Sequence, residues 1–353
     1  MAFDRHRNRR VTAMNGPDVS GPLAAGSGGR SPRPETVPPI LTLTVNPTVD
    51  ICCEVDRLAD IGKTRARVRF VAAGGGGINV ARGVSRLGGR AIAVHTAGRE
   101  VGQRLNRLLD EEGVDHLPVG IAGETREAFV LFETESRRSY HIVPPGPRLD
   151  DAEGERLLDA LGRAAGGHQY VVASGSLPSG LPETFYAAVA RRVKESGARL
   201  VLDTSGRALR ESLHEGVFLR RCNNHEAAGL VGRAVRSFDD ARSVNESLLA
   251  AGATEIAVTT LGELGALCST RYGHTELRAP PSPGEPLSDA GAGDAMVAAL
   301  TLRLAAGDDP VEACALGVAV AAASVLTPDT EPFDREVAES LYPAVRIGRQ
   351  TGS

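Results

Sequence analysis

An aspartate near the start of an apolar segment has the surroundings that best suit chemistry. Asp294 lies in the sequence SDAGAGDAM (288–296), where a glycine-containing loop leads into apolar residues at helical spacing. Free N–H groups at such a helix start can hold a transferring phosphoryl group, and a carboxylate beside them can take the proton of an attacking hydroxyl. The helix dipole alone also favours an aspartate there, so a purely structural interpretation remains equally open for this motif taken alone.

Three other segments could hold a ligand. Four glycines at 74–77 precede the helical sequence INVAR and let backbone N–H groups approach a ligand, although an ordinary loop would look similar. Asn223 and Glu226 are three residues apart, so on a first helical turn their oxygens could hold a hydrated Mg²⁺, and a helix cap is the alternative. The sequence TLGELG (260–265) follows a strand pattern. Because ligands of open α/β sheets bind beyond the carboxyl ends of strands, we expect these segments to converge on one cleft.

The elements that must position these segments alternate along the chain. Apolar patterns predict strands at 40–45, 91–96, 170–173, 199–203, 217–221, 255–259 and 265–269. Helices are predicted at 77–87, 102–112 and 183–196, and further helices begin at Ala292, Pro310 and Asp334. Strands that alternate with helices indicate βαβ units, and therefore an α/β fold with a mainly parallel sheet.

Two segments depart from this alternation. Residues 48–70 and 127–143 each have strand patterns with no helix between the strands of the segment, which predicts a small antiparallel sheet apart from the main one. Such a sheet could cover a site as a lid or pair with a second copy of the chain. Asp50, Lys63 and Arg126 lie on or beside it; a carboxylate suits sugar hydroxyls and an arginine suits a phosphate. Each of these charges, taken alone, is better explained as a solvated surface group.

The bulk composition argues against several classes of protein. The net charge is −4, from 40 basic and 44 acidic residues, without the basic excess of a nucleic-acid-binding protein. The sequence contains no run of about 18 apolar residues, so no membrane span is predicted. The five cysteines show no CxxC spacing, which favours reduced thiols in a cytoplasmic enzyme. Residues 1–37 are rich in Arg, Gly, Pro and Ser and are expected to form a disordered tail before a folded domain at 38–348.

In their order, six segments resemble the motifs of the PfkB family of sugar kinases: TVNPTVD (44–50), GGGGINVAR (74–82), SGSLPSG (174–180), NNHE (223–226), TLGELG (260–265) and GAGD (291–294). The resemblance extends over about residues 39–345. It implies a ribokinase-like three-layer α/β/α domain with a mainly parallel central sheet and a small β-sheet lid. It also implies ATP and Mg²⁺, a K⁺ site, and a homodimer that forms through the lid sheets.

The resemblance also implies a role for each matching residue. Asp294 would be the catalytic base, and the anion hole would consist of Gly291, Ala292 and Gly293. The sugar hydroxyls would contact Asp50, Gly75, Gly76 and Asn79, and the substrate phosphate would lie near Lys63, Arg126 and Ser176. The magnesium and the nucleotide would be held by Asn223, Glu226, Thr260, Gly262 and Gly265. The K⁺ neighbourhood would comprise Ser288, Ala290, Thr327 and Asp329.

The sequence is most similar to the branch of this family that acts on phosphorylated hexoses. In 1-phosphofructokinases and tagatose-6-phosphate kinases the third position of the glycine run is usually lysine; here it is Gly76, which favours fructose 6-phosphate as the acceptor. Those two activities remain the alternatives, together with a sugar-phosphate-binding regulator that has lost catalysis. A nicotinamide-dependent dehydrogenase is disfavoured because no GxGxxG turn follows the first strand. The sequence departs from the family at Arg221-Cys222, where Lys-Pro is usual, at Ala290 and at His141.

Overall fold

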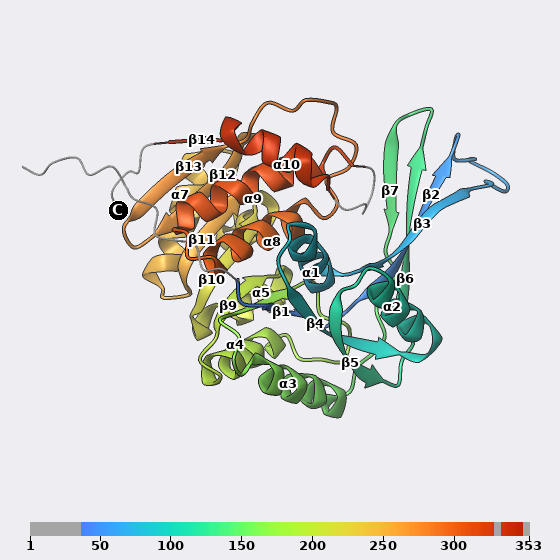
Figure 1. Cartoon of the computed structure of the whole chain (residues 1–353), viewed down its shortest axis with the longest axis horizontal. Helices are drawn as coiled ribbons and strands as arrows, with labels where there is room; N and C mark the ends of the chain where they lie inside the picture. The colour runs from blue at the N-terminus through green and yellow to red at the C-terminus, as the bar shows by residue number, and fades with distance from the viewer. Residues whose placement is uncertain (1–36, 328–332, 349–353) are drawn as a thin grey trace, which may run out of the picture. The chain divides into compact units, whose positions relative to one another are not determined.

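The largest feature of the fold is a ten-stranded sheet with helices on both faces (Figure 1). The computed structural model describes residues 37–327 and 333–348, so the tail up to residue 36 and Asp329 lie outside the described residues. The strand order is β14-β13-β12-β11-β10-β9-β8-β1-β4-β5. The parallel part comprises β1 (Ile40–Thr44), β4 (Ala91–Gly98), β5 (Asp115–Ile121), β8 (Tyr170–Ser174), β9 (Arg199–Asp203), β10 (Val217–Asn223) and β11 (Thr254–Thr260). The antiparallel edge comprises β12 (Gly265–Thr270), β13 (Gly273–Arg278) and β14 (Arg346–Ile347).

Alternate residues of the central strands pack against different helices. Tyr170 and Val172 of β8 belong to the apolar core beneath one set of helices, whereas Val171 and Ala173 belong to the core beneath the other set. Because successive side chains of a strand point to opposite faces, this alternation defines three layers. The first set comprises α1 (Gly76–Arg86), α2 (Arg99–Glu111), α8 (Ala292–Ala305), α9 (Pro310–Ser324) and α10 (Arg335–Leu341). The second comprises α3 (Asp151–Ala165), α4 (Phe185–Glu195), α5 (Gly206–Glu211), α6 (Asn224–Val231) and α7 (Phe238–Ala250). The predicted α/β/α architecture is confirmed.

A second, four-stranded sheet extends from one side of the main sheet (Figure 1). It has the order β3-β2-β6-β7, formed by β2 (Thr48–Val55), β3 (Arg67–Gly74), β6 (Arg126–Glu133) and β7 (Arg138–Ile142). The expectation that this sheet is antiparallel is wrong for its central pair, since β2 and β6 run parallel. The reason lies in the connection: α1, β4, α2 and β5 intervene between β3 and β6, so the chain re-enters the lid from the same end as β2.

The five cysteines are all buried as thiols. Within the described part of the chain, no helix is both long enough and apolar enough to cross a membrane.

Candidate active site

A cleft of about 340 Å³ lies where the parallel strands end and helix α8 begins. The carboxyl ends of β8, β9 and β10 each contribute residues to it, as expected for a ligand site of an open α/β sheet. Its lining includes predicted residues from four separate motifs, namely Gly76, Ser176, Asn223, Glu226, Gly291, Gly293 and Asp294. It also includes residues that were not predicted, among them Ser174, Asp203, Thr204 and Arg221.

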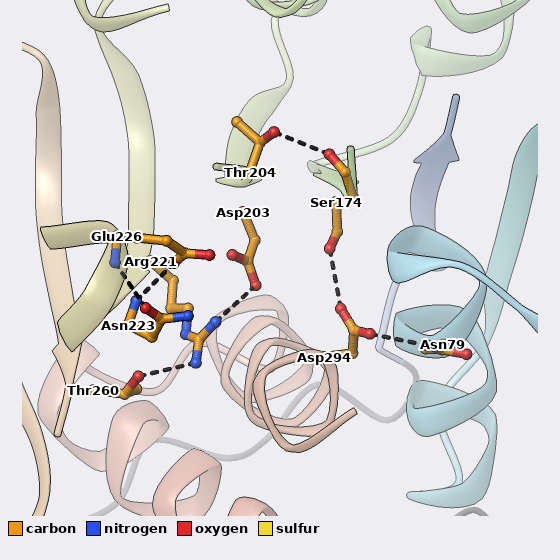
Figure 2. Close-up of polar contacts among 10 residues, drawn as sticks. Asn79, Ser174, Asp203, Thr204, Arg221, Asn223, Glu226, Thr260 and Asp294 are labelled. Carbon is orange, nitrogen blue, oxygen red and sulfur yellow. Dashed lines mark hydrogen bonds and ion pairs between the residues drawn. The ribbon is translucent and has the colours of Figure 1, made fainter. Parts of the chain in front are cut away.

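Asp294 is held by one hydrogen bond on each carboxylate oxygen (Figure 2). Asn79 Nδ2 donates to Oδ2 at 3.0 Å, and Ser174 Oγ donates to Oδ1 at 3.0 Å. Burial and, next, the negative charge of Asp203 raise the pKa of Asp294 to about 7, against the opposing effects of these hydrogen bonds and of Arg221. A carboxylate with a pKa near neutrality is suited to accept a proton and release it again at physiological pH.

The four-glycine loop lets α1 begin in contact with the main sheet. A Cβ atom on Gly76 would lie 2.2 Å from Ser174 Oγ, and one on Gly77 would lie 2.3 Å from the carbonyl oxygen of Leu43. Gly75 has a φ of 104°, which a residue with a side chain rarely adopts. Glycine is therefore required at these positions, and the close approach brings Asn79 within hydrogen-bonding distance of Asp294.

The start of α8 forms the floor of the cleft. Gly291 caps the helix with a φ of 75°, and Ala292 is the first helical residue. The first-turn N–H groups of a helix have no partner four residues back, so those of Gly293 and Asp294 are available to an anionic ligand. The N–H of Ala292 donates instead to the carbonyl oxygen of Asp289 at 3.3 Å.

Arg221 lies over this helix start. A Cβ atom on Gly293 would lie 2.6 Å from Arg221 Nη1, so the guanidinium rests directly on the glycine. Its Nη1 lies 3.4 Å from Asp203 Oδ2, and its Nη2 donates to Thr260 Oγ1 at 2.9 Å (Figure 2). In the sequence, Arg221 stands out only as a departure from a family pattern, and Asp203 belongs to no predicted motif. Both residues occur at strand ends, and that position is the signal that could have identified them.

Asn223 and Glu226 form the helix cap that was the alternative to a magnesium site. The side chain of Asn223 accepts from the N–H of Glu226 at 2.8 Å, and Glu226 Oε2 accepts from the N–H of Asn223 at 2.7 Å. This capping box fixes both side chains at the wall of the cleft. Burial and the charge of Asp203 raise the pKa of Glu226, because two carboxylates face the same space.

The carboxylate oxygens of Asp203 and Glu226 are suitable ligands for Mg²⁺. Among the described residues, no three His, Cys, Asp or Glu side chains gather as a ready-made metal site. Mg²⁺ usually binds through one or two carboxylates together with water and substrate phosphates. Asp203 and Glu226 supply carboxylates on one side of the cleft, so the donor set fits that mode of binding.

The residues predicted to contact the sugar are only partly brought together. Ser176 lines the cleft and accepts from Asn46 Nδ2 at 3.5 Å, while the carbonyl oxygen of Asn46 accepts from Arg126 Nη2 at 3.0 Å. Asp50 is buried beside the glycine loop. Lys63 is exposed in the connection between β2 and β3, at the end of the lid hairpin that is distant from Thr48 and Gly74. Within one chain, therefore, Lys63 is not placed at the cleft.

The remaining predicted residues do not line the cleft or lie outside the described part. Thr260 is paired with Asn223 between β10 and β11, and Gly262 lies in the short turn that follows. Gly265 starts β12, where a Cβ atom would lie 1.9 Å from the carbonyl oxygen of Leu277, so close strand packing explains this glycine. The segment that contains Ser288 and Ala290 lies beside the end of α9, since the N–H of Ser288 donates to the carbonyl oxygen of Val325. Thr327 belongs to the same neighbourhood.

Comparison with known proteins identifies the family. Residues 44–335 match the family described as pfkB family carbohydrate kinase. The chain belongs to the pfkB carbohydrate kinase family. The resemblance inferred from the six motifs is thereby confirmed.

Relatives within the pfkB family have related activities. The chain is 40% identical to the ATP-dependent 6-phosphofructokinase isozyme 2 of Mycobacterium tuberculosis, over 87% of this chain and 90% of the relative. It is 30% identical to the 1-phosphofructokinase of Bacillus subtilis, over 88% of this chain and 99% of the relative. It resembles the crystal structure of Escherichia coli phosphofructokinase-2 in complex with potassium, with a TM-score of 0.82 and 32% identity over 87% of this chain and 98% of that one. The pfkB chain described here is an ATP-dependent sugar-phosphate kinase.

Proposed function

We propose that this kinase transfers the γ-phosphoryl group of ATP to the O1 hydroxyl of fructose 6-phosphate and forms fructose 1,6-bisphosphate. The single observation that carries the proposal is the position of Asp294, held by Asn79 and Ser174 at the helix start that forms the floor of the cleft. The preference for fructose 6-phosphate is supported by Gly76, where lysine is usual in the alternatives, and by the name of the Mycobacterium tuberculosis relative.

Asp294 accepts the proton of the attacking hydroxyl in the proposed reaction. Its two hydrogen-bond donors hold the carboxylate in one orientation, so the oxygen lone pairs are aligned before the substrate arrives. The free N–H groups at the start of α8 and the guanidinium of Arg221 face the negative charge that develops on the phosphoryl oxygens. Magnesium, when bound, neutralises further phosphate charge, and Asn223 and Glu226 are the residues that would organise it.

The sugar is held on the opposite side of Asp294. Asp50, Gly75, Gly76 and Asn79 contact its hydroxyls in this proposal, and the buried position of Asp50 beside the glycine loop supports the role of its carboxylate. Arg126 and Ser176 bind the substrate phosphate, supported by the hydrogen bonds that connect both to Asn46. The roles of Lys63, Gly262 and Gly265 stay predictions from the resemblance.

A substrate panel tests the proposed acceptor. The full-length protein would be given ATP, Mg²⁺ and, in turn, fructose 6-phosphate, fructose 1-phosphate and tagatose 6-phosphate, and kcat/KM would be measured from ADP release. ADP is the appropriate readout because the two fructose phosphates give the same bisphosphate. We expect fructose 6-phosphate to be preferred by about 10-fold or more. A preference of that size for either other sugar would replace the proposed acceptor.

Two further proposals concern K⁺ and self-association. Ser288, Ala290 and Thr327 form the K⁺ neighbourhood, supported by the contact between their segments and by the potassium complex of the Escherichia coli structure. Activity in KCl should exceed activity in NaCl at equal ionic strength.

The lid pairs with a second copy, supported by exposed apolar side chains on its strands, among them Val68, Phe129 and Ile142. Light scattering should show a dimer, and Phe129→Ser should shift it toward the monomer.

A further inference from the structure

The carboxylate of Asp50 is buried at the root of the lid, close to the four-glycine loop. It lies on β2 opposite β3, and a Cβ atom on Gly74 would lie 2.3 Å from Asp50 Oδ2. Burial raises the pKa of Asp50, which favours the neutral acid. An acid of this kind would be a poor partner for a sugar, because an ionised carboxylate can accept two hydroxyl hydrogen bonds, whereas the neutral acid loses acceptor capacity.

Basic side chains from three elements oppose this effect of burial. Arg82 of α1 has the largest opposing influence, and Arg126 of β6 and His141 of β7 add smaller ones; a hydrogen bond from Thr48 on β2 acts in the same direction. His141 is exposed to solvent, and Arg126 already donates to the carbonyl oxygens of Pro144 and Asn46. Arg82 is the buried one of these groups, and its guanidinium also forms an ion pair with Glu112 at the end of α2.

Arg82 is itself fixed by two hydrogen bonds. Nη1 donates to the carbonyl oxygen of Ala73 at 3.1 Å, and Nε donates to Glu112 Oε2 at 2.6 Å. Ala73 directly precedes Gly74, so the first bond holds the end of β3 against α1. Asn79, one helical turn before Arg82, holds Asp294. One helix thus presents two polar residues, one toward the proposed base and the other toward the root of the lid.

We propose that Arg82 is a positioning residue for sugar binding, which holds the carboxylate of Asp50 as a hydroxyl acceptor and fixes the end of β3 without touching the substrate. This inference rests on the role of Asp50 in the proposed function. Helix α1 then couples the lid to sugar binding. Loss of the Arg82 side chain weakens the binding of the sugar phosphate, whereas ATP binding and the transfer step depend on other elements.

The test compares Arg82→Met, which removes both charge and hydrogen bonds, with Arg82→Lys, which restores the charge alone. Arg86→Met is the matched control, since Arg86 is an exposed arginine on the same helix. For Arg82→Met we expect KM for fructose 6-phosphate to rise about 10-fold or more, from loss of a charge-supported hydrogen-bonding partner, while kcat and KM for ATP change less than about threefold. Arg86→Met should behave as the wild type.

A pH titration separates this role from a merely structural one. The Kd of the sugar phosphate, measured by calorimetry without ATP, should increase on acidification. This loss of affinity should begin about one pH unit higher or more in Arg82→Met. Arg82→Lys should return the pH dependence toward the wild type even where it leaves the affinity reduced. Equal losses in kcat and in both KM values, or no recovery of the pH dependence in Arg82→Lys, would overturn the inference.

A ligand-free measurement keeps this inference distinct from the proposed function. In protein labelled with ¹³C at the aspartate carboxyls, the Asp50 signal is assigned from its absence in Asp50→Asn and is then titrated. The titration of Asp50 must move to higher pH in Arg82→Met and stay in place in Arg86→Met. If no sugar phosphate binds but the titration moves, the proposed function fails and the electrostatic coupling holds. If the titration does not move, the inference itself fails.

Discussion

Asp203 and Asp294 face the same cleft, and the guanidinium of Arg221 is attracted to both. The ion pair between Arg221 and Asp203 spans 3.4 Å, and the charge of Arg221 also acts on Asp294. A buried anion, a buried cation and a proposed base are thus arranged beside one helix start. The electrostatic balance among these three side chains sets the protonation state on which the proposed reaction depends.

Removing the base should abolish turnover and preserve binding. We expect Asp294→Asn to lose on the order of 10²- to 10⁴-fold in kcat, because an amide cannot accept the proton of the hydroxyl. The asparagine can keep the hydrogen bond from Asn79 or Ser174, so the Kd for the sugar phosphate should change little. Steady-state kinetics and calorimetry measure the two quantities. A well-folded Asp294→Asn protein with near-normal turnover would remove Asp294 from the mechanism.

The raised pKa of Asp294 predicts a specific pH dependence. Since the base acts in its ionised form and its pKa is about 7, kcat/KM should rise with pH and level off above about pH 8. The folded state also binds this proton more tightly than the unfolded state. The corresponding stability is present below the ordinary aspartate pKa, 3.8, and is lost as pH rises toward 7. Asp294→Asn should therefore be more stable than the wild type at pH 8 in thermal unfolding, and this difference should shrink on acidification.

Arg221 should contribute to both stability and nucleotide binding. Arg221→Met leaves Asp203 buried without its cation, which should cost about 3 kcal/mol of unfolding free energy in urea denaturation. The double variant with Asp203→Asn should recover part of that loss, because the uncompensated charge is gone. In the proposed site, Arg221→Met should also raise KM for ATP. A double variant as unstable as the sum of its two single variants would show that the ion pair has no coupling.

Even an alanine in the glycine loop should lower stability and activity. Gly77→Ala would place a Cβ atom 2.3 Å from the carbonyl oxygen of Leu43, so the start of α1 must move. We expect a loss of about 1–3 kcal/mol in stability and a fall in kcat, since Asn79 moves with the helix. Gly229→Ala in α6 is the control, because a Cβ atom there meets nothing within 4 Å. That substitution should leave activity unchanged and stabilise the helix by about 0.5–1 kcal/mol.

Glu226 allows the helix cap to be separated from the magnesium role. Glu226→Gln keeps an oxygen that can accept from the N–H of Asn223 but removes the charge, whereas Glu226→Ala removes both. If the carboxylate organises Mg²⁺, the glutamine variant should fold normally and need a higher Mg²⁺ concentration for half-maximal rate. An unchanged Mg²⁺ dependence in Glu226→Gln would leave the residue with its capping role alone.

Local patterns in the sequence were sufficient to predict most elements and the local motifs. The strands from Ile40, Arg199 and Val217 and the helices from Ala292 and Pro310 were predicted because buried segments of an α/β fold carry strong apolar patterns. Strand β5 was not predicted, since much of it is exposed and contains a proline, and helix α3 was not identified. Asp294, Asn223 and Glu226 were selected because a helix start is visible in a short stretch of residues.

Which side chains meet in the cleft depends on the packing of the strands. Ser174, Asp203 and Arg221 are single residues at the ends of β8, β9 and β10, and their neighbourhood follows from strand order rather than from spacing in the chain. The same holds for the parallel pairing of β2 with β6 and for the exposed place of Lys63 at the end of its hairpin. Local patterns place Asp294 at the start of a helix. Its raised pKa depends on packing, because charges and hydrogen bonds act over a few ångströms in space.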